Sequence, residues 1–221
     1  DGEKYVHENR IETKASIDEH FININFKIVS KIIISSVVPS LTHEYTSYLT
    51  KVSRINPFII NSNNSNLEFN VDSPDEVGAD RICNSFAAKN LFGAPAVVID
   101  FGSATTYDVI NNKGVFIGGA IAPGIDVSAN HLIQKTALLK STAFQFPSKA
   151  IGKNTKTNLQ SGIMFGGLDA INGMLKRIQN EMESDNINII LTGGFSSLIS
   201  KELKCNHHLE PLLTLHGMRL I

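Results

Sequence analysis

The sequence lacks an excess of either charge, carries few cysteines and contains no long apolar run. Its 20 Lys and Arg residues balance 21 Asp and Glu residues, so the basic surface needed to bind nucleic acid or anionic lipid is absent. Cys83 and Cys205 lie far apart, which favours a reduced, cytoplasmic protein over a disulfide-linked secreted one. No apolar run reaches the roughly 18 residues of a transmembrane helix, and no signal peptide is visible. We therefore expect neither a nucleic-acid nor a membrane partner.

Hydrophobic residues make up 42% of the 221-residue chain, which excludes a disordered protein and suffices for one large core or two small ones. The first 14 residues read like part of a β-meander, with Asp1-Gly2 as a turn. A strand that should precede this turn is missing from the sequence. We expect that strand to lie before Asp1.

The N-terminal half contains a candidate strand and two candidate helices. Residues 31–38 are rich in β-branched side chains and are followed by Pro39, which predicts a buried strand. A short helix is predicted at 41–51. The second helix has clear start and stop signals, in which Ser73 fits the N-cap, Pro74 the first position, Glu76 a capping box and Gly93 the end. Its buried stripe would be Ala79, Cys83, Phe86 and Ala87.

The C-terminal half alternates strands and helices. Three strands joined by short turns are predicted first, at residues 96–101, 105–110 and 115–121. They are followed by helices at 126–138 and 159–182, a strand at 187–191 and a helix at 197–203. This order indicates a mixed α/β fold.

The most informative segment is DFGSATT, where an apolar strand ends in a carboxylate and enters a turn of small residues. Phosphate groups are bound by such turns, because Gly102 would let the backbone come close and Ser103 would donate a hydrogen bond. Asp100 would hold a cation that offsets the phosphate charge. The alternative is an ordinary hairpin with a satisfied aspartate.

Other segments carry weaker signals. Asp80 and Arg81 lie together near a helix start, which suits an anionic substrate with a hydroxyl group but also suits a solvated charge pair. Residues 152–155 resemble a P-loop fragment, yet Asn154 stands where Ser or Thr must follow the lysine, so a polar turn is predicted. Residues 192–194 after a buried strand could admit a nucleotide against bare backbone or form a simple turn.

Taken together, these segments resemble the type III pantothenate kinases. The matching stretches occur in the family's order and span nearly the whole chain: 33–39 (IISSVVP), 76–82 (EVGADRI), 100–106 (DFGSATT), 118–125 (GGAIAPGI), 151–155 (IGKNT), 192–194 (TGG) and 213–220 (LTLHGMRL). The resemblance implies ATP-dependent phosphorylation of pantothenate, the first step of coenzyme A synthesis. It also implies two ribonuclease-H-like halves with mixed sheets, an actin-like ATPase fold, here divided into residues 1–92 and 93–221.

The resemblance also implies roles for individual residues. Asp80 matches the proton acceptor, and the pantothenate contacts match Gly78, Ala79, Asp80, Arg81 and Thr155. Asp100 matches the ligand of a monovalent cation, K⁺ or NH₄⁺, and Mg²⁺ would accompany ATP. The expected ATP contacts are Gly102, Ser103, Gly193 and Gly194. The family implies a homodimer with the substrate site near the subunit interface.

Two departures from the family pattern stand out. The family opens with a strand and a D-x-G-N-T phosphate loop, which the 221 residues do not contain, and we expect it to precede Asp1. Val71 stands where the family often has a substrate-contacting tyrosine, so substrate packing should differ. The alternative function is a non-catalytic regulator that resembles the Bvg accessory factors, which share the fold and would not need Asp80 or Asp100.

Overall fold

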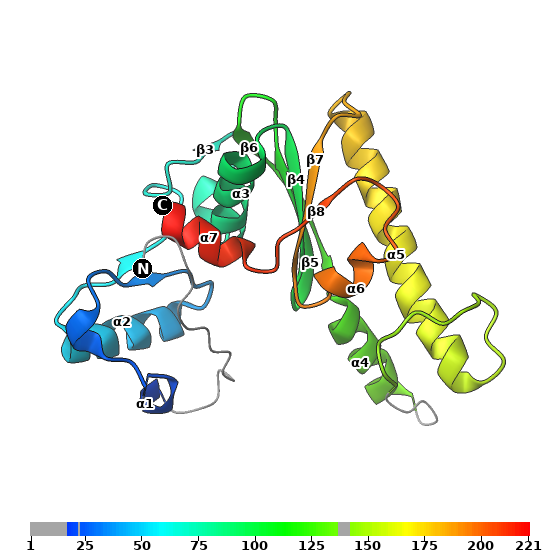
Figure 1. The fold of residues 1–221 in the computed structure, drawn as a ribbon, viewed down its shortest axis with the longest axis horizontal. Coiled ribbons are helices and arrows are strands. Elements are labelled where there is room, and N and C mark those ends of the chain that lie inside the picture. Colours follow the sequence, from blue (N-terminus) through cyan, green and yellow to red (C-terminus); the bar gives the residue numbers. More distant parts are fainter. Residues whose placement is uncertain (1–16, 22, 137–141) are drawn as a thin grey trace.

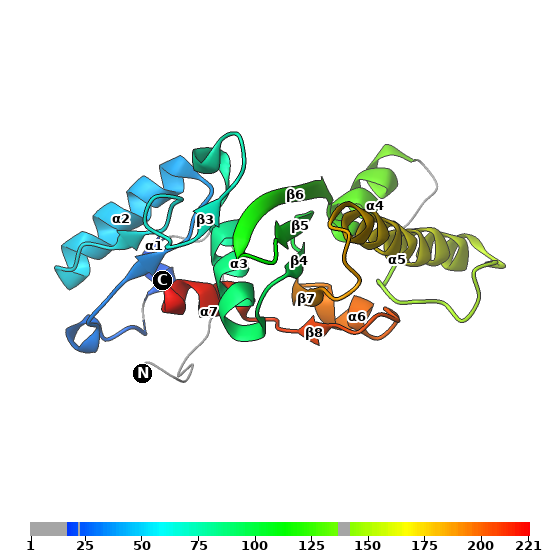
Figure 2. The same ribbon diagram turned by 90° about the horizontal axis from the view of Figure 1, so that it is seen from above.

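The computed structural model describes residues 17–21, 23–136 and 142–221, and its centre is a six-stranded mixed sheet (Figures 1 and 2). The strand order is β3-β6-β5-β4-β7-β8. The strands are β3 (Glu68–Phe69), β4 (Ala96–Phe101), β5 (Ala104–Ile110), β6 (Val115–Pro123), β7 (Asn188–Gly193) and β8 (His208–Leu209). The predicted mixed α/β fold is confirmed, whereas the β-meander predicted for the first 14 residues lies outside the described residues.

The three predicted antiparallel strands form the middle of this sheet. β5 pairs antiparallel with both β4 and β6, and β7 then joins the other edge of β4 in parallel. A three-stranded meander extended by parallel strands is the arrangement expected for a ribonuclease-H-like half. β3 adds to the far side of β6 in parallel, so a segment from the N-terminal half belongs to the same sheet. The division between residues 92 and 93 stays a prediction.

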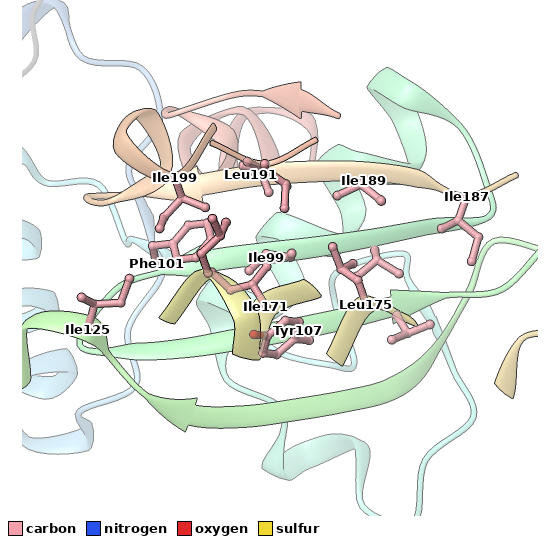
Figure 3. Packing of buried hydrophobic residues seen from close by; sticks show 14 of the residues in the cluster. Ile99, Phe101, Tyr107, Ile125, Ile171, Leu175, Ile187, Ile189, Leu191 and Ile199 are labelled. Atoms are coloured by element: carbon pink, nitrogen blue, oxygen red, sulfur yellow. The ribbon is translucent and has the colours of Figure 1, made fainter. Parts of the chain in front are cut away.

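Helices cover both faces of the sheet (Figures 1 and 2). One face carries α4 (Ile125–Lys135), α5 (Thr155–Glu181) and α6 (Ser196–Ser200), and the other carries α3 (Ala79–Phe92) and α7 (Leu213–Leu220). On the α5 side, Ile99, Phe101 and Leu191 pack with Ile171 in the largest apolar cluster (Figure 3). On the α3 side, Val98 packs with Ala87 and Leu213.

The alternation of side chains along β4 and β5 places the polar residues. Ile99 and Phe101 of β4 face α5, as Tyr107 of β5 does. Because successive side chains of a strand point to opposite faces, Asp100 and Asp108 face α3 instead.

The N-terminal region forms a separate small sheet. The region consists of α1 (Ile17–His20), the 3-10 helix η1 (Phe26–Ile28), β1 (Ile33–Ile34), α2 (Pro39–Ser53) and β2 (Phe58–Ile59), and the sheet is formed by β1 and β2. The strand predicted at 31–38 is only two residues long, because β1 is paired with β2 alone among the described residues, through Ile33↔Phe58 and Ile34↔Ile59. The helix predicted at 41–51 begins earlier, with Pro39 in its first turn.

The predicted start of α3 is wrong. Pro74–Glu76 form a short 3-10 helix, η2, and the Ser73 side chain makes no capping hydrogen bond. Val77 is extended, with ψ of 121°, so the chain breaks there and α3 starts after Gly78. The predicted end is confirmed, because the Gly93 N–H donates to the Lys89 carbonyl. Ala79, Cys83 and Ala87 are buried as predicted, while Phe86 is only half-buried.

The later elements differ from prediction mainly at their ends. α5 begins four residues earlier than predicted, because the Asn154 side chain accepts from the Thr157 N–H and completes a capping box. α4 ends at Lys135 because Thr136 is already extended, so the predicted end at residue 138 is wrong, and residues 137–138 themselves lie outside the described part. α6 is shorter than predicted and ends at Ser200. In the described part of the chain, no helix is both long and apolar enough to cross a membrane.

The contact between α3 and α7 depends on a glycine. A Cβ at Gly217 of α7 would collide with the Cys83 carbonyl oxygen of α3, so the two helices approach through bare backbone. Gly173 in the middle of α5 has open space around its Cα.

We expect opposite effects when alanine replaces these two glycines. Gly217→Ala should lower the free energy of unfolding by about 1–3 kcal/mol, because the methyl group forces α7 away from α3. Gly173→Ala should raise it by about 0.5–1 kcal/mol, because alanine loses less backbone entropy in a helix. Urea unfolding midpoints measure both, and a neutral Gly217→Ala would contradict the close packing of α3 and α7.

Candidate active site

The candidate site lies where the start of α3 packs on the face of β4 and β5 that carries Asp100 and Asp108 (Figure 1). The first turn of α3 carries Asp80 and Arg81. Two carboxylates face this turn from the sheet, Asp100 near the end of β4 and Asp108 in β5. The structure therefore joins the two segments that the sequence singled out separately.

Arg81 forms an ion pair that the sequence did not reveal. Its Nε donates to Asp108 Oδ1 at 2.6 Å, and the Asp108 side chain is completely buried. Burial raises the pKa of Asp108 to about 7, the Arg81 guanidinium opposes that shift, and the negative charges of Asp80 and Asp100 add to it. The helix start is thus held to the sheet by a charge-assisted hydrogen bond.

Asp100 is held by a chain of side-chain hydrogen bonds from two helices. Thr214 Oγ1 in α7 donates to Asn84 Oδ1 at 2.7 Å, and Asn84 Nδ2 in α3 donates to Asp100 Oδ2 at 2.9 Å. Burial raises the pKa of Asp100, although the hydrogen bond from Asn84 works against this. Asn84 follows Asp80 by four residues, so helical spacing could have indicated that both lie on one face.

Glycines make room around the carboxylates. A Cβ at Gly193 would collide with Asp100 Oδ1, and the positive φ of 86° also favours glycine there. A Cβ at Gly78 would lie 2.6 Å from Asp80 Oδ1. Parallel pairing of β4 with β7 sets Phe101 opposite Gly193, and the Gly194 N–H donates to the Phe101 carbonyl at 3.0 Å. The two segments predicted to contact ATP are therefore neighbours.

The turn between β4 and β5 is exposed beside these groups. Gly102 donates its N–H to the Ala104 carbonyl at 3.0 Å, and both Gly102 and Ser103 are exposed. Among the described residues, no hydrogen bond engages the Ser103 hydroxyl. This hydroxyl is thus free to donate to an incoming anion.

Thr155 does not join this group within one chain. It is exposed at the start of α5, and that end of the helix lies on the opposite side of the sheet from α3 (Figures 1 and 2). The structure brings together the remaining predicted residues: Gly78, Ala79, Asp80, Arg81, Asp100, Gly102, Ser103, Gly193 and Gly194. Their individual roles stay predictions.

The Asp100 carboxylate has one oxygen that could bind a cation. Asp100 Oδ2 is occupied by Asn84, whereas no hydrogen bond within the described ranges reaches Oδ1. Over those same ranges, no cluster of three or more His, Cys, Asp or Glu side chains could hold a metal ion. Three carboxylates, those of Asp80, Asp100 and Asp108, face the single guanidinium of Arg81, so an added cation would meet a net negative charge at the site.

Comparisons with known proteins identify the family of the chain. The sequence model of the family described as type III pantothenate kinase matches residues 3–177. A type III pantothenate kinase of Moorella thermoacetica is 39% identical over 203 residues, which cover 91% of this chain and 80% of that protein. One of Koribacter versatilis is 42% identical over 200 residues, which cover 90% of this chain and 73% of that protein.

A solved structure shares the fold. It is that of a Campylobacter jejuni protein assigned to the Baf family of transcriptional activators, with a TM-score of 0.63 and 22% identity. The match covers 93% of this chain and 86% of that one. The family match over most of the sequence and relatives of about 40% identity lead to one assignment. The chain belongs to the type III pantothenate kinase family.

Proposed function

We propose that this protein transfers the γ-phosphoryl group of ATP to the primary hydroxyl of pantothenate, giving 4'-phosphopantothenate in the first step of coenzyme A synthesis. The observation that carries this proposal is the family membership over most of the chain. The site supports it, because a carboxylate and a guanidinium in the first turn of α3 lie beside the Asp100 turn.

Asp80 is the candidate that accepts the proton of the pantothenate hydroxyl. Its carboxylate is half-buried at the helix start, where Oδ1 accepts from the Arg81 N–H at 2.8 Å. The transition state of phosphoryl transfer is loose, so the main task is to hold the hydroxyl in line with the phosphoryl group. The missing side chain of Gly78 leaves the place that the Asp80 carboxylate itself occupies, since a Cβ there would lie 2.6 Å from Asp80 Oδ1.

The turn at Gly102–Ser103 and the backbone at Gly193–Gly194 are the candidates for contacts with ATP. The Ser103 hydroxyl can donate to a phosphate oxygen, and the glycines allow close approach of the nucleotide. Asp100 Oδ1 would hold a K⁺ or NH₄⁺ ion, and Mg²⁺ would arrive with ATP. When bound, these cations offset the charge that the phosphates develop during transfer.

We also propose a cytoplasmic, homodimeric enzyme. Both cysteines are free, which suits a reducing compartment. Within one chain Thr155 lies apart from Asp80, so a substrate contact from both residues requires Thr155 of the partner subunit. The alternative function, a non-catalytic regulator, has less support. The likeness to the Baf-family protein concerns the fold only. The balanced charge of the sequence also gives no reason to expect binding to nucleic acid.

The direct test is a coupled assay of ADP release. ATP turnover should require pantothenate and should rise steeply with K⁺ or NH₄⁺, because a cation at Asp100 would neutralise phosphate charge. Turnover without pantothenate, or equal rates in Na⁺ alone, would count against the assignment.

Two matched variants separate the roles of the carboxylates. Asp80→Asn removes basicity but keeps size, so kcat should fall about 10²–10⁴-fold while the KM for ATP stays nearly unchanged. Asp100→Asn should instead raise both the K⁺ requirement and the KM for ATP. A K⁺ titration of both variants distinguishes them, and a wild-type kcat in Asp80→Asn would remove the proposed proton acceptor.

Co-expression of two inactive variants tests the shared site. In a dimer that joins an Asp80→Asn subunit and a Thr155→Ala subunit, one of the two sites has both native residues. Random pairing makes half of the dimers mixed, so about a quarter of wild-type activity should return at low pantothenate. Light scattering should give the mass of a dimer. If mixing restores nothing, Thr155 does not act across the interface.

A further inference from the structure

Arg81 is fixed from one side by two buried groups. Its Nε contacts the fully buried Asp108, and its Cζ lies 5.6 Å from the centroid of the Phe116 ring, whose side chain is only 1% exposed. These contacts hold one edge and one face of the planar guanidinium. Over the residues that the structure describes, its two Nη groups have no hydrogen-bond or ion-pair partner. The Arg81 side chain is 16% exposed, so the group is not sealed in the core.

Asp108 is itself held rigidly. It lies in the middle of β5, opposite Val98 of β4 and Gly119 of β6. A Cβ at Gly119 would collide with the Tyr107 carbonyl oxygen, so β6 lies tightly against β5 at this point. The carboxylate therefore has a position set by the sheet and not by a mobile loop.

A buried carboxylate at this position does not serve stability well. Taking its charge out of water is unfavourable, and an apolar residue of similar size at such a position often gives a protein that is as stable or more so. The negative charges of Asp80 and Asp100 add to this cost. Asp108 is buried beside other negative charges and is bound to Arg81 of the candidate site. Its role is therefore better explained by the orientation that it gives to the Arg81 guanidinium than by stability.

We propose that Asp108 is the positioning residue that orients Arg81, so that the free Nη edge of the guanidinium binds the carboxylate of the acid substrate. This rests on the proposed function. Two parallel N–H groups match a carboxylate only when the guanidinium plane is correctly aligned. Asp108 binds Nε, and the Phe116 ring packs against the face of the guanidinium. The two Nη groups are therefore free to bind the substrate.

Asp108→Asn tests this proposal because it keeps the shape and removes the charge. We expect the KM for pantothenate to rise about 10- to 100-fold, which is the usual cost of losing a side chain that orients a ligand-binding residue. The kcat should stay within about threefold of the wild-type value, and the KM for ATP should not change. The control is Ser85→Ala, which removes a fully buried hydroxyl one turn along the same helix and should leave all three constants unchanged.

A double-mutant cycle separates positioning from a structural role. Arg81→Ala should also raise the KM for pantothenate, and adding Asp108→Asn to it should have no further effect, because Asp108 acts through Arg81. Additive effects would overturn the proposal. Arg81→Lys provides a second variant that keeps the charge beside Asp108 but loses the fork, and its KM for pantothenate should rise as well.

Pantothenyl alcohol, in which a hydroxyl replaces the carboxylate, identifies the group that Arg81 binds. The wild type and Asp108→Asn should have the same KM for this compound. A persistent difference would overturn the carboxylate assignment, as would a rise in the KM for ATP. If the wild type does not phosphorylate pantothenate at all, the proposed function fails; a wild-type KM for pantothenate in Asp108→Asn, in an otherwise active enzyme, overturns only the positioning role.

Discussion

A carboxylate buried within a sheet must have a partner, and this requirement determines how the α3 side of the molecule is built. Asp108 has no access to water, and Asp100 has little, so both depend on side chains from α3. Arg81 and Asn84 supply those partners from successive turns of the helix. Any rotation of α3 about its axis would break both contacts, so the sheet fixes the helix and thereby the position of Asp80.

The same requirement extends to the end of the chain. Asn84 can donate to Asp100 because Thr214 supplies the hydrogen bond that its oxygen needs. α7 reaches this place because Gly217 lets it pack directly against the backbone of α3. Two glycines, Gly217 in α7 and Gly193 beside Asp100, thus supply the space in which a polar network can be enclosed.

Sequence patterns predicted the parts of the fold that depend on local chemistry. β4 has its predicted bounds, because an apolar run between turn residues defines a central strand. The predicted start of α3 was wrong, because it depends on the extended backbone at Val77. The predicted length of β1 was also wrong, because it depends on how many residues pair with β2. Asp80, Arg81 and Asp100 could be identified from motifs. Asp108 could not, because it meets Arg81 only in the folded chain, across a separation of 27 residues.

The bond between Thr214 and Asn84 joins residues that are 130 positions apart. A ribosome makes the chain from its N-terminus, so α3 and β4 leave the exit tunnel long before α7 exists. Until then Asn84 and Asp100 lack part of their hydrogen-bond network, and the strand that brings Gly193 beside β4 is also late. The hydrogen-bond network around Asp100 is therefore one of the last features to form during biosynthesis.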